Sequence, residues 1–256
     1  MIDDKHIVKL VDYPISTECF PSVEIKGGIC YFLWDKDTEK DCQFTSFYRH
    51  PAKTMVRPLR IKGASSIIRF SEGISIFLKV ISHTEIYFDS MVSSRKPFGL
   101  GTEEKGHIEN RDGDILFYGN KAHNYISKTE IKNNPKWIDT HKVYISYAYG
   151  AGEGYPHQII NIPFLGEKGS ACSETYLVIG PFGRKEEAIN AISYIKTKFF
   201  RFMVMLVKYT QHATQNVYRH VPIQDFSRSW TDNQLYEKYE LSEDEILFIE
   251  SMVKNM

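Results

Sequence analysis

Short runs of apolar and β-branched residues in the first 35 positions predict two strands. These runs are His6–Tyr13 and Ile29–Trp34, and a connector rich in Pro and Ser and ending in Gly27-Gly28 separates them. The second run is apolar on both faces, which is typical of a strand covered by helices on each side. Because two strands cannot form a domain alone, this pair requires a partner sheet, which we do not expect this chain to supply.

The middle of the chain predicts further strands, a helix and long loops. Strand patterns occupy Ile115–Tyr118, Lys142–Ala148 and Thr175–Ile179, and Gly180-Pro181 should end the last of them. Apolar residues at helical spacing predict a helix over Ser71–Ile81. The residues of 93–99 are typical of a loop.

The clearest helical pattern runs from Lys185 to Lys208, with acidic residues in its first turn, where the helix dipole favours them. Three of its cations, Lys198, Arg201 and Lys208, fall opposite the apolar stripe. This face is either a solvated surface or a surface that contacts phosphates. A last amphipathic helix is predicted over residues 242–253, where Ser and Glu at the first and fourth positions form a capping box.

The overall composition is neutral and typical of a globular protein. The chain has 256 residues, of which 42% are hydrophobic and 25% charged, and its 32 basic and 32 acidic residues cancel. This excludes a uniformly basic nucleic-acid coat and a disordered acidic protein. The charge is nevertheless segregated, because Gln43–Ser71 and Ala188–Gln224 contain no acid. We expect these two acid-free windows to converge on one basic face that binds duplex DNA.

The ends and the cysteines suggest a cytoplasmic protein with no membrane partner. The first residues are acidic and lack the apolar core of a signal peptide. The longest apolar stretch, Phe199–Val207, contains an arginine and is too short to span a bilayer. The four cysteines have no spacing typical of a zinc site and form no disulfide framework.

Two short motifs resemble cofactor or substrate sites but have simpler explanations. Gly150–Gly154 has the spacing of a phosphate-binding loop, yet Tyr155-Pro156 stands where a helix should begin, so we interpret the segment as an ordinary loop. The segment Asn133–Trp137 lacks the second proline of an adenine-binding Asn-Pro-Pro motif, which favours a turn.

A third pattern matches a nuclease. An Asp followed by Glu-x-Lys can hold Mg²⁺ and position a water molecule. Asp12 with Glu24-Ile25-Lys26 has this form, and so has Asp114 with Glu130-Ile131-Lys132. The pattern is short and arises by chance in many chains, so it supports only an alternative hypothesis, a type II restriction endonuclease.

Longer segments carry a resemblance that covers nearly the whole chain. They are Asp4–Tyr13, Cys19–Asp35, Ser93–Leu100, Glu174–Gly180, Thr197–Phe202, Val221–Ser227 and Trp230–Asp232. These segments resemble adenine-N6 DNA methyltransferases of restriction–modification systems, in the part that follows their Asn-Pro-Pro-Tyr motif. In that family the S-adenosylmethionine loop and the Asn-Pro-Pro-Tyr site lie upstream, and this chain contains neither.

The resemblance implies an α+β fold and three parts. Residues 1–42 would be the last edge strands of a Rossmann-like methyltransferase sheet, 43–225 a mixed target-recognition domain for DNA, and 226–256 a helical tail. Ile7–Val11 and Ile29–Leu33 should then pair antiparallel at the edge of an incomplete sheet, with their apolar faces partly exposed. S-adenosylmethionine is expected for the complete enzyme, with none bound by this chain, which would be inactive alone and would associate with an N-terminal catalytic part.

The resemblance also implies which residues contact DNA. The family stacks a connector aromatic on the flipped adenine, and Phe20 is the matching position, although it could equally be a buried residue that closes the connector. The expected DNA contacts are Arg57, Arg60, Arg95, Lys96, Lys198 and Arg201. Besides the endonuclease, a fragment without function remains an alternative.

Overall fold

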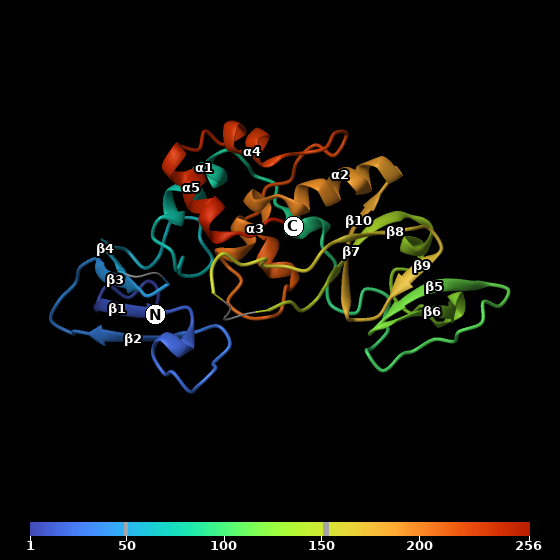
Figure 1. Ribbon diagram of the computed structural model, residues 1–256, viewed down its shortest axis with the longest axis horizontal. Helices are drawn as coiled ribbons and strands as arrows, with labels where there is room; N and C mark the ends of the chain where they lie inside the picture. Colours follow the sequence, from blue (N-terminus) through green and yellow to red (C-terminus); the bar gives the residue numbers. More distant parts are fainter. Residues whose placement is uncertain (49–50, 151–153) are drawn as a thin grey trace.

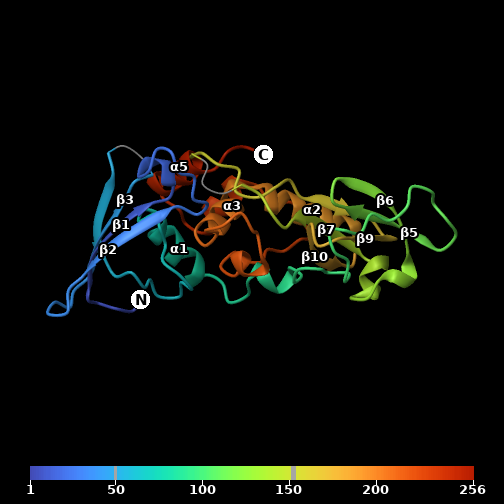
Figure 2. The same cartoon turned by 90° about the horizontal axis from the view of Figure 1, so that it is seen from below.

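The computed structural model describes residues 1–48, 51–150 and 154–256, together with all their side chains except that of residue 122. Within these residues, three small sheets and five helices form the predicted α+β fold, which is elongated. One sheet lies at one end of the molecule, the other two towards the opposite end, and most helices lie between them (Figures 1 and 2).

The first sheet has the strand order β2-β1-β3-β4. Its strands are β1 (Ile7–Tyr13), β2 (Ile29–Trp34), β3 (Cys42–Ser46) and β4 (Lys53–Arg57). Strands β1 and β2 pair antiparallel with Leu10 opposite Phe32, as predicted, and β3 lies parallel to β1 on its other side. The expectation that the chain would not supply further strands is wrong, because β3 and β4 extend the sheet to Arg57.

Strand β2 is an exposed edge. Tyr31, Phe32, Leu33 and Trp34 are each about half exposed, which confirms the predicted exposure of apolar faces. The prediction of helices on both sides of β2 is wrong, because the strand lies at the border of the sheet and its side chains alternate between two open faces. The inner face of β1 and β3 has only a small core of its own.

The two other sheets are interleaved along the chain. Their strand orders are β10-β7-β8 and β6-β5-β9. The strands are β5 (Asp114–Gly119), β6 (Ala122–Ser127), β7 (His141–Ser146), β8 (Phe164–Gly166), β9 (Ser170–Cys172) and β10 (Tyr176–Phe182). Along the chain, β9 therefore lies between β8 and β10, which belong to the other sheet. Strand β10 continues past Gly180-Pro181, so its predicted end is wrong; a register shift after Ile179 accommodates the proline.

The helices are α1 (Gly73–Ser82), α2 (Lys185–Lys196), α3 (Lys198–Met205), α4 (Asp232–Lys238) and α5 (Glu243–Met252). The single long helix predicted over Lys185–Lys208 is therefore wrong. It breaks at Thr197, whose extended backbone ends α2 and whose hydroxyl accepts a hydrogen bond from the Phe200 N–H to begin α3. The predicted helices at α1 and α5 are confirmed, and Ser242 and Glu245 form the expected capping box of α5.

The main core joins helices α1 to α5 with strands β7 and β10. It is rich in aromatic side chains, and those of Phe199, Phe200, Phe202 and Tyr194 are fully buried. A second core lies around Phe117 at the far end of the molecule. The division of the chain at residues 42 and 225 stays a prediction, although the first sheet continues through β4. None of the described helices is long and apolar enough to cross a membrane.

Candidate nucleic-acid interface

The two acid-free windows meet in the structure. The Tyr209 hydroxyl lies 2.9 Å from the Ser66 hydroxyl and also donates to the Ile67 carbonyl. Next to this contact, the Ser65 backbone N–H and hydroxyl lie 3.3 and 3.1 Å from Nε2 of His220. Segments about 150 positions apart in the chain therefore form one surface.

A polar groove of about 330 Å³ lies at this meeting point. We call it the window groove, and its lining residues are Ser65, Ser66, Val207, Tyr209, Thr210, His212, Thr214, Asn216, Val217 and Arg219. None of these described residues carries a carboxylate. Hydroxyl and amide donors beside an exposed guanidinium are groups that bind phosphate oxygens. Burial lowers the pKa of His220 to about 4, so this ring is neutral at pH 7 and serves as an acceptor for Ser65.

A stack of side chains continues from the window groove to the predicted DNA-contacting loop. The ring of His212 lies on that of Tyr147 with centroids 4.9 Å apart, and the Arg95 guanidinium lies 5.0 Å from the centre of the same Tyr147 ring. Backbone bonds fix this junction, because Ala213 N–H donates to the Tyr147 carbonyl and Tyr149 N–H to that of Gln211. The groove and the Arg95 loop are thus parts of one continuous surface.

Arg95 and Lys96 are the predicted cations that remain accessible on that surface. Both side chains are about half exposed, and both face Glu174, at 3.0 Å from Arg95 Nε and 3.6 Å from Lys96 Nζ. The Glu174 side chain is almost completely buried. The segment 93–99 is a loop, as predicted.

Arg57 and Arg201, two of the predicted DNA contacts, are buried, and the prediction that Arg201 lies on a face opposite the apolar stripe is wrong. Arg201 is 1% exposed and its guanidinium donates to the carbonyls of Thr197, Lys196 and Gln158. Arg57 donates to the Ile68 and Pro58 carbonyls and to the Ser71 hydroxyl. Burial lowers the pKa of each guanidinium to about 10. Each of these cations holds backbone segments together rather than facing solvent.

Lys198 and Arg60 are paired with carboxylates of the same chain. Lys198 forms an ion pair with Glu250 of α5, and Arg60 donates two hydrogen bonds to Asp3, at 2.7 and 2.6 Å. Lys208 donates to the Tyr149 and Gly150 carbonyls. The cation face predicted from helical spacing therefore contacts the rest of the chain, because the helix breaks at Thr197 and α3 is buried.

Phe20 follows a short 3₁₀ helix (Ser16–Glu18) in the connector between β1 and β2 and is 51% exposed. The alternative of a buried connector residue is therefore wrong. Its role in stacking on a base stays a prediction.

Three carboxylates of the nuclease-like sets contact other side chains. Asp12 pairs with Arg69 at 2.7 Å, and Glu24 pairs with Lys26 of its own motif. Asp114 lies 2.5 Å from His107. Across the part of the chain that the structure describes, no three His, Cys, Asp or Glu side chains cluster as metal ligands.

The two remaining motifs have local roles or fall outside the described residues. Asn134 adopts a left-handed backbone conformation and precedes a 3₁₀ helix (Pro135–Asp139), which agrees with a turn. Of the predicted loop 150–154, residues 151–153 lie outside the described residues.

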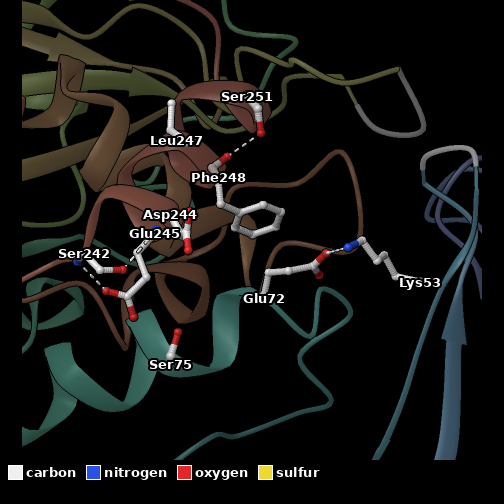
Figure 3. A pocket seen from close by; sticks show the side chains of 9 residues that line it. All are labelled: Lys53, Glu72, Ser75, Ser242, Asp244, Glu245, Leu247, Phe248 and Ser251. Carbon is white, nitrogen blue, oxygen red and sulfur yellow. Dashed lines mark hydrogen bonds and ion pairs between the residues drawn. The ribbon is translucent and has the colours of Figure 1, made fainter.

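A larger cavity of about 680 Å³ lies between α1, α5 and Lys53 of β4. Its lining is acidic, whereas that of the window groove contains no carboxylate. Figure 3 shows the carboxylates of Glu72, Asp244 and Glu245 around it, with Lys53 the cation of its lining. Negative charge repels phosphate, so this cavity is not part of the candidate interface.

The chain matches no protein-family profile. Over 70 residues it is 33% identical to an uncharacterized adenine-specific methylase of Mycoplasma pneumoniae. The matched part is 27% of this chain and 14% of that protein, so the chain spans a small share of its relative's length. The similarity is confined to this short segment.

Three residues of the surface were missed from the sequence: Tyr147, His212 and Arg219. The latter two lie in the second acid-free window. Lys198 and Arg201 lie in the same window, so the absence of acid did not separate exposed cations from those that contact the rest of the chain. Tyr147 carries no sequence signal, because its place beside Arg95 depends on tertiary packing.

Proposed function

We propose that this chain is the DNA-binding, target-recognition portion of a site-specific adenine-N6 DNA methyltransferase of the Asn-Pro-Pro-Tyr class. The observation that carries the proposal is the window groove, where two acid-free segments distant in sequence meet without a carboxylate in the lining. A neutral chain has no electrostatic need for such segregation, whereas a DNA-binding surface does. The similarity to an adenine-specific methylase supports this choice of nucleic-acid function.

In this proposal the window groove binds the phosphate backbone and the Arg95-Lys96 loop approaches the bases. Phosphate contacts supply affinity that falls with salt, while base contacts supply the sequence preference. The methyl donor S-adenosylmethionine belongs to the complete enzyme, and we assign none of its contacts to this chain. The expected protein partner is the N-terminal catalytic part of the methyltransferase. The expected substrate is double-stranded DNA in the cytoplasm.

The test is the affinity of the full chain for a random-sequence duplex, measured by fluorescence anisotropy over a salt titration. Arg219→Glu should weaken binding to all sequences by about tenfold and reduce the salt slope by about one, because one phosphate contact is lost. The matched control is Arg111→Glu, which makes the same charge change at an exposed position in the loop before β5. Equal effects of the two variants, or no binding by the unmodified chain, would refute the proposal.

A further inference from the structure

We propose that Arg95 reads a base edge and that Glu174 and Tyr147 are the positioning residues that fix its guanidinium for this purpose. This inference rests on the proposed function and deepens it, because it assigns sequence preference to one side chain and its supports. It separates the interface into a phosphate-binding part, the window groove, and a sequence-reading part, Arg95.

Glu174 is built to hold a cation in one place. It is 7% exposed, its backbone N–H donates to the Leu100 carbonyl, and one carboxylate oxygen accepts from the Thr102 N–H at 3.3 Å. The other oxygen faces two cations, Arg95 Nε at 3.0 Å and Lys96 Nζ at 3.6 Å, and has no hydrogen-bond partner among the described residues. A nearly buried carboxylate is costly unless it is paired, so it retains the arginine beside it.

The contact leaves the recognition edge of the guanidinium open. Glu174 forms an ion pair on the Nε side, and the Arg95 guanidinium carbon lies 5.0 Å from the centre of the Tyr147 ring. Within residues 1–48, 51–150 and 154–256, neither terminal nitrogen of Arg95 makes a hydrogen bond. These two nitrogens are the pair that donates to O6 and N7 of guanine in a major groove.

The loop itself is held in a strained shape that presents these cations. Lys96 has a φ of 58°, a left-handed conformation that costs about 1 kcal/mol or more for a residue with a side chain. Gly99 N–H donates to the Lys96 carbonyl, and the Asn134 side chain donates to the Pro97 carbonyl at 2.8 Å. The neighbouring turn at Asn134 thus fixes the backbone, while Glu174 fixes the side chain. A merely solvated loop needs neither support.

The experiment compares sequence preference with general affinity. The full chain is used to select duplexes from a random library, and the affinity for the selected duplex is divided by that for a shuffled one. Glu174→Gln keeps the size of the side chain but loses its charge, and Tyr147→Leu removes the ring. Each should lower this ratio at least tenfold, while the affinity for shuffled duplex changes less than twofold.

Glu187→Gln is the matched control, because Glu187 pairs with Arg184 in an ion pair away from this surface. It should leave the ratio unchanged. The inference is overturned, while the proposed function stands, if Glu174→Gln and Tyr147→Leu melt normally and leave the ratio of selected to shuffled affinity unchanged. Equal loss of affinity for both duplexes would overturn it too, since that outcome indicates a structural role. Failure of the unmodified chain to bind any duplex would instead refute the proposed function.

Discussion

Replacing Arg201 by Met should destabilise the protein without affecting DNA binding. The substitution removes a hydrogen bond from each of the three carbonyls that the guanidinium contacts, but two of these carbonyls keep another donor. The Thr197 carbonyl keeps a bond from the Arg201 N–H, and the Gln158 carbonyl keeps one from the Ile160 N–H. The Lys196 carbonyl, at the end of α2, loses its bond from the guanidinium.

The magnitude follows from this count. A hydrogen bond from a charged group to a buried acceptor contributes about 1.5–3 kcal/mol, and an acceptor left unsatisfied costs about 1–3 kcal/mol. Removing a desolvated charge returns part of this loss. We therefore expect the free energy of unfolding to fall by about 3 kcal/mol, which lowers the melting temperature by roughly 6–12 °C in a chain of this size.

The assay is thermal and urea unfolding followed by circular dichroism, combined with DNA binding well below the transition. Arg111→Met, at an exposed position, should change stability by less than about 0.5 kcal/mol. If Arg201→Met lowers the free energy of unfolding by less than about 1 kcal/mol, Arg201 does not stabilise the core through its hydrogen bonds, and the interpretation is refuted. A loss of DNA affinity in the folded variant would refute it as well, because that result would return Arg201 to the phosphate-contacting surface.

Three further outcomes follow from particular side chains. The pKa of His220 lies below its value in the unfolded chain, so the unfolded state takes up a proton first as the pH falls. The free energy of unfolding should therefore fall by up to about 3 kcal/mol between pH 6.5 and 4. In His220→Gln the urea midpoint should depend less on pH over that range, and an unchanged pH dependence would contradict this. Thr197→Val should cost about 1 kcal/mol in urea unfolding through loss of the α3 cap, and a neutral result would show that the cap adds nothing. The double variant Tyr31→Lys, Leu33→Lys should reduce light scattering of concentrated protein with little change in melting temperature, because both side chains are exposed on an edge strand. Unchanged scattering would show that β2 is not the site of association.

The sequence predicts the strands and helices that have strong local patterns. Strands β1, β2, β5, β7 and β10 are uniform or alternating apolar runs, and they form where expected. Strands β3 and β4 contain polar residues such as Gln43 and Thr54 at positions that reach solvent, and β8 and β9 have only three residues each, so no local pattern marked them.

The candidate interface was less predictable because the carboxylate with which a cation pairs can lie far away in the sequence. Lys198 meets Glu250 across 52 positions and Arg60 meets Asp3 across 57. No spacing rule within a helix or loop contains this information. Arg95 and Lys96 meet Glu174 across more than 70 positions, and both side chains are about half exposed.

The interleaving of β9 has a consequence for how the chain reaches its fold. Strands β5 and β6 form a local hairpin, but β9 pairs with β5 across more than 50 residues and lies, along the chain, between β8 and β10 of the other sheet. The two sheets therefore cannot be separated by any single cut, and neither is a contiguous module that could be transplanted alone. Non-local parallel pairing also slows folding, since the intervening loop must close before contacts stabilise it. A chimaera between related proteins that keeps both sheets intact must accordingly transfer 114–182 as one block.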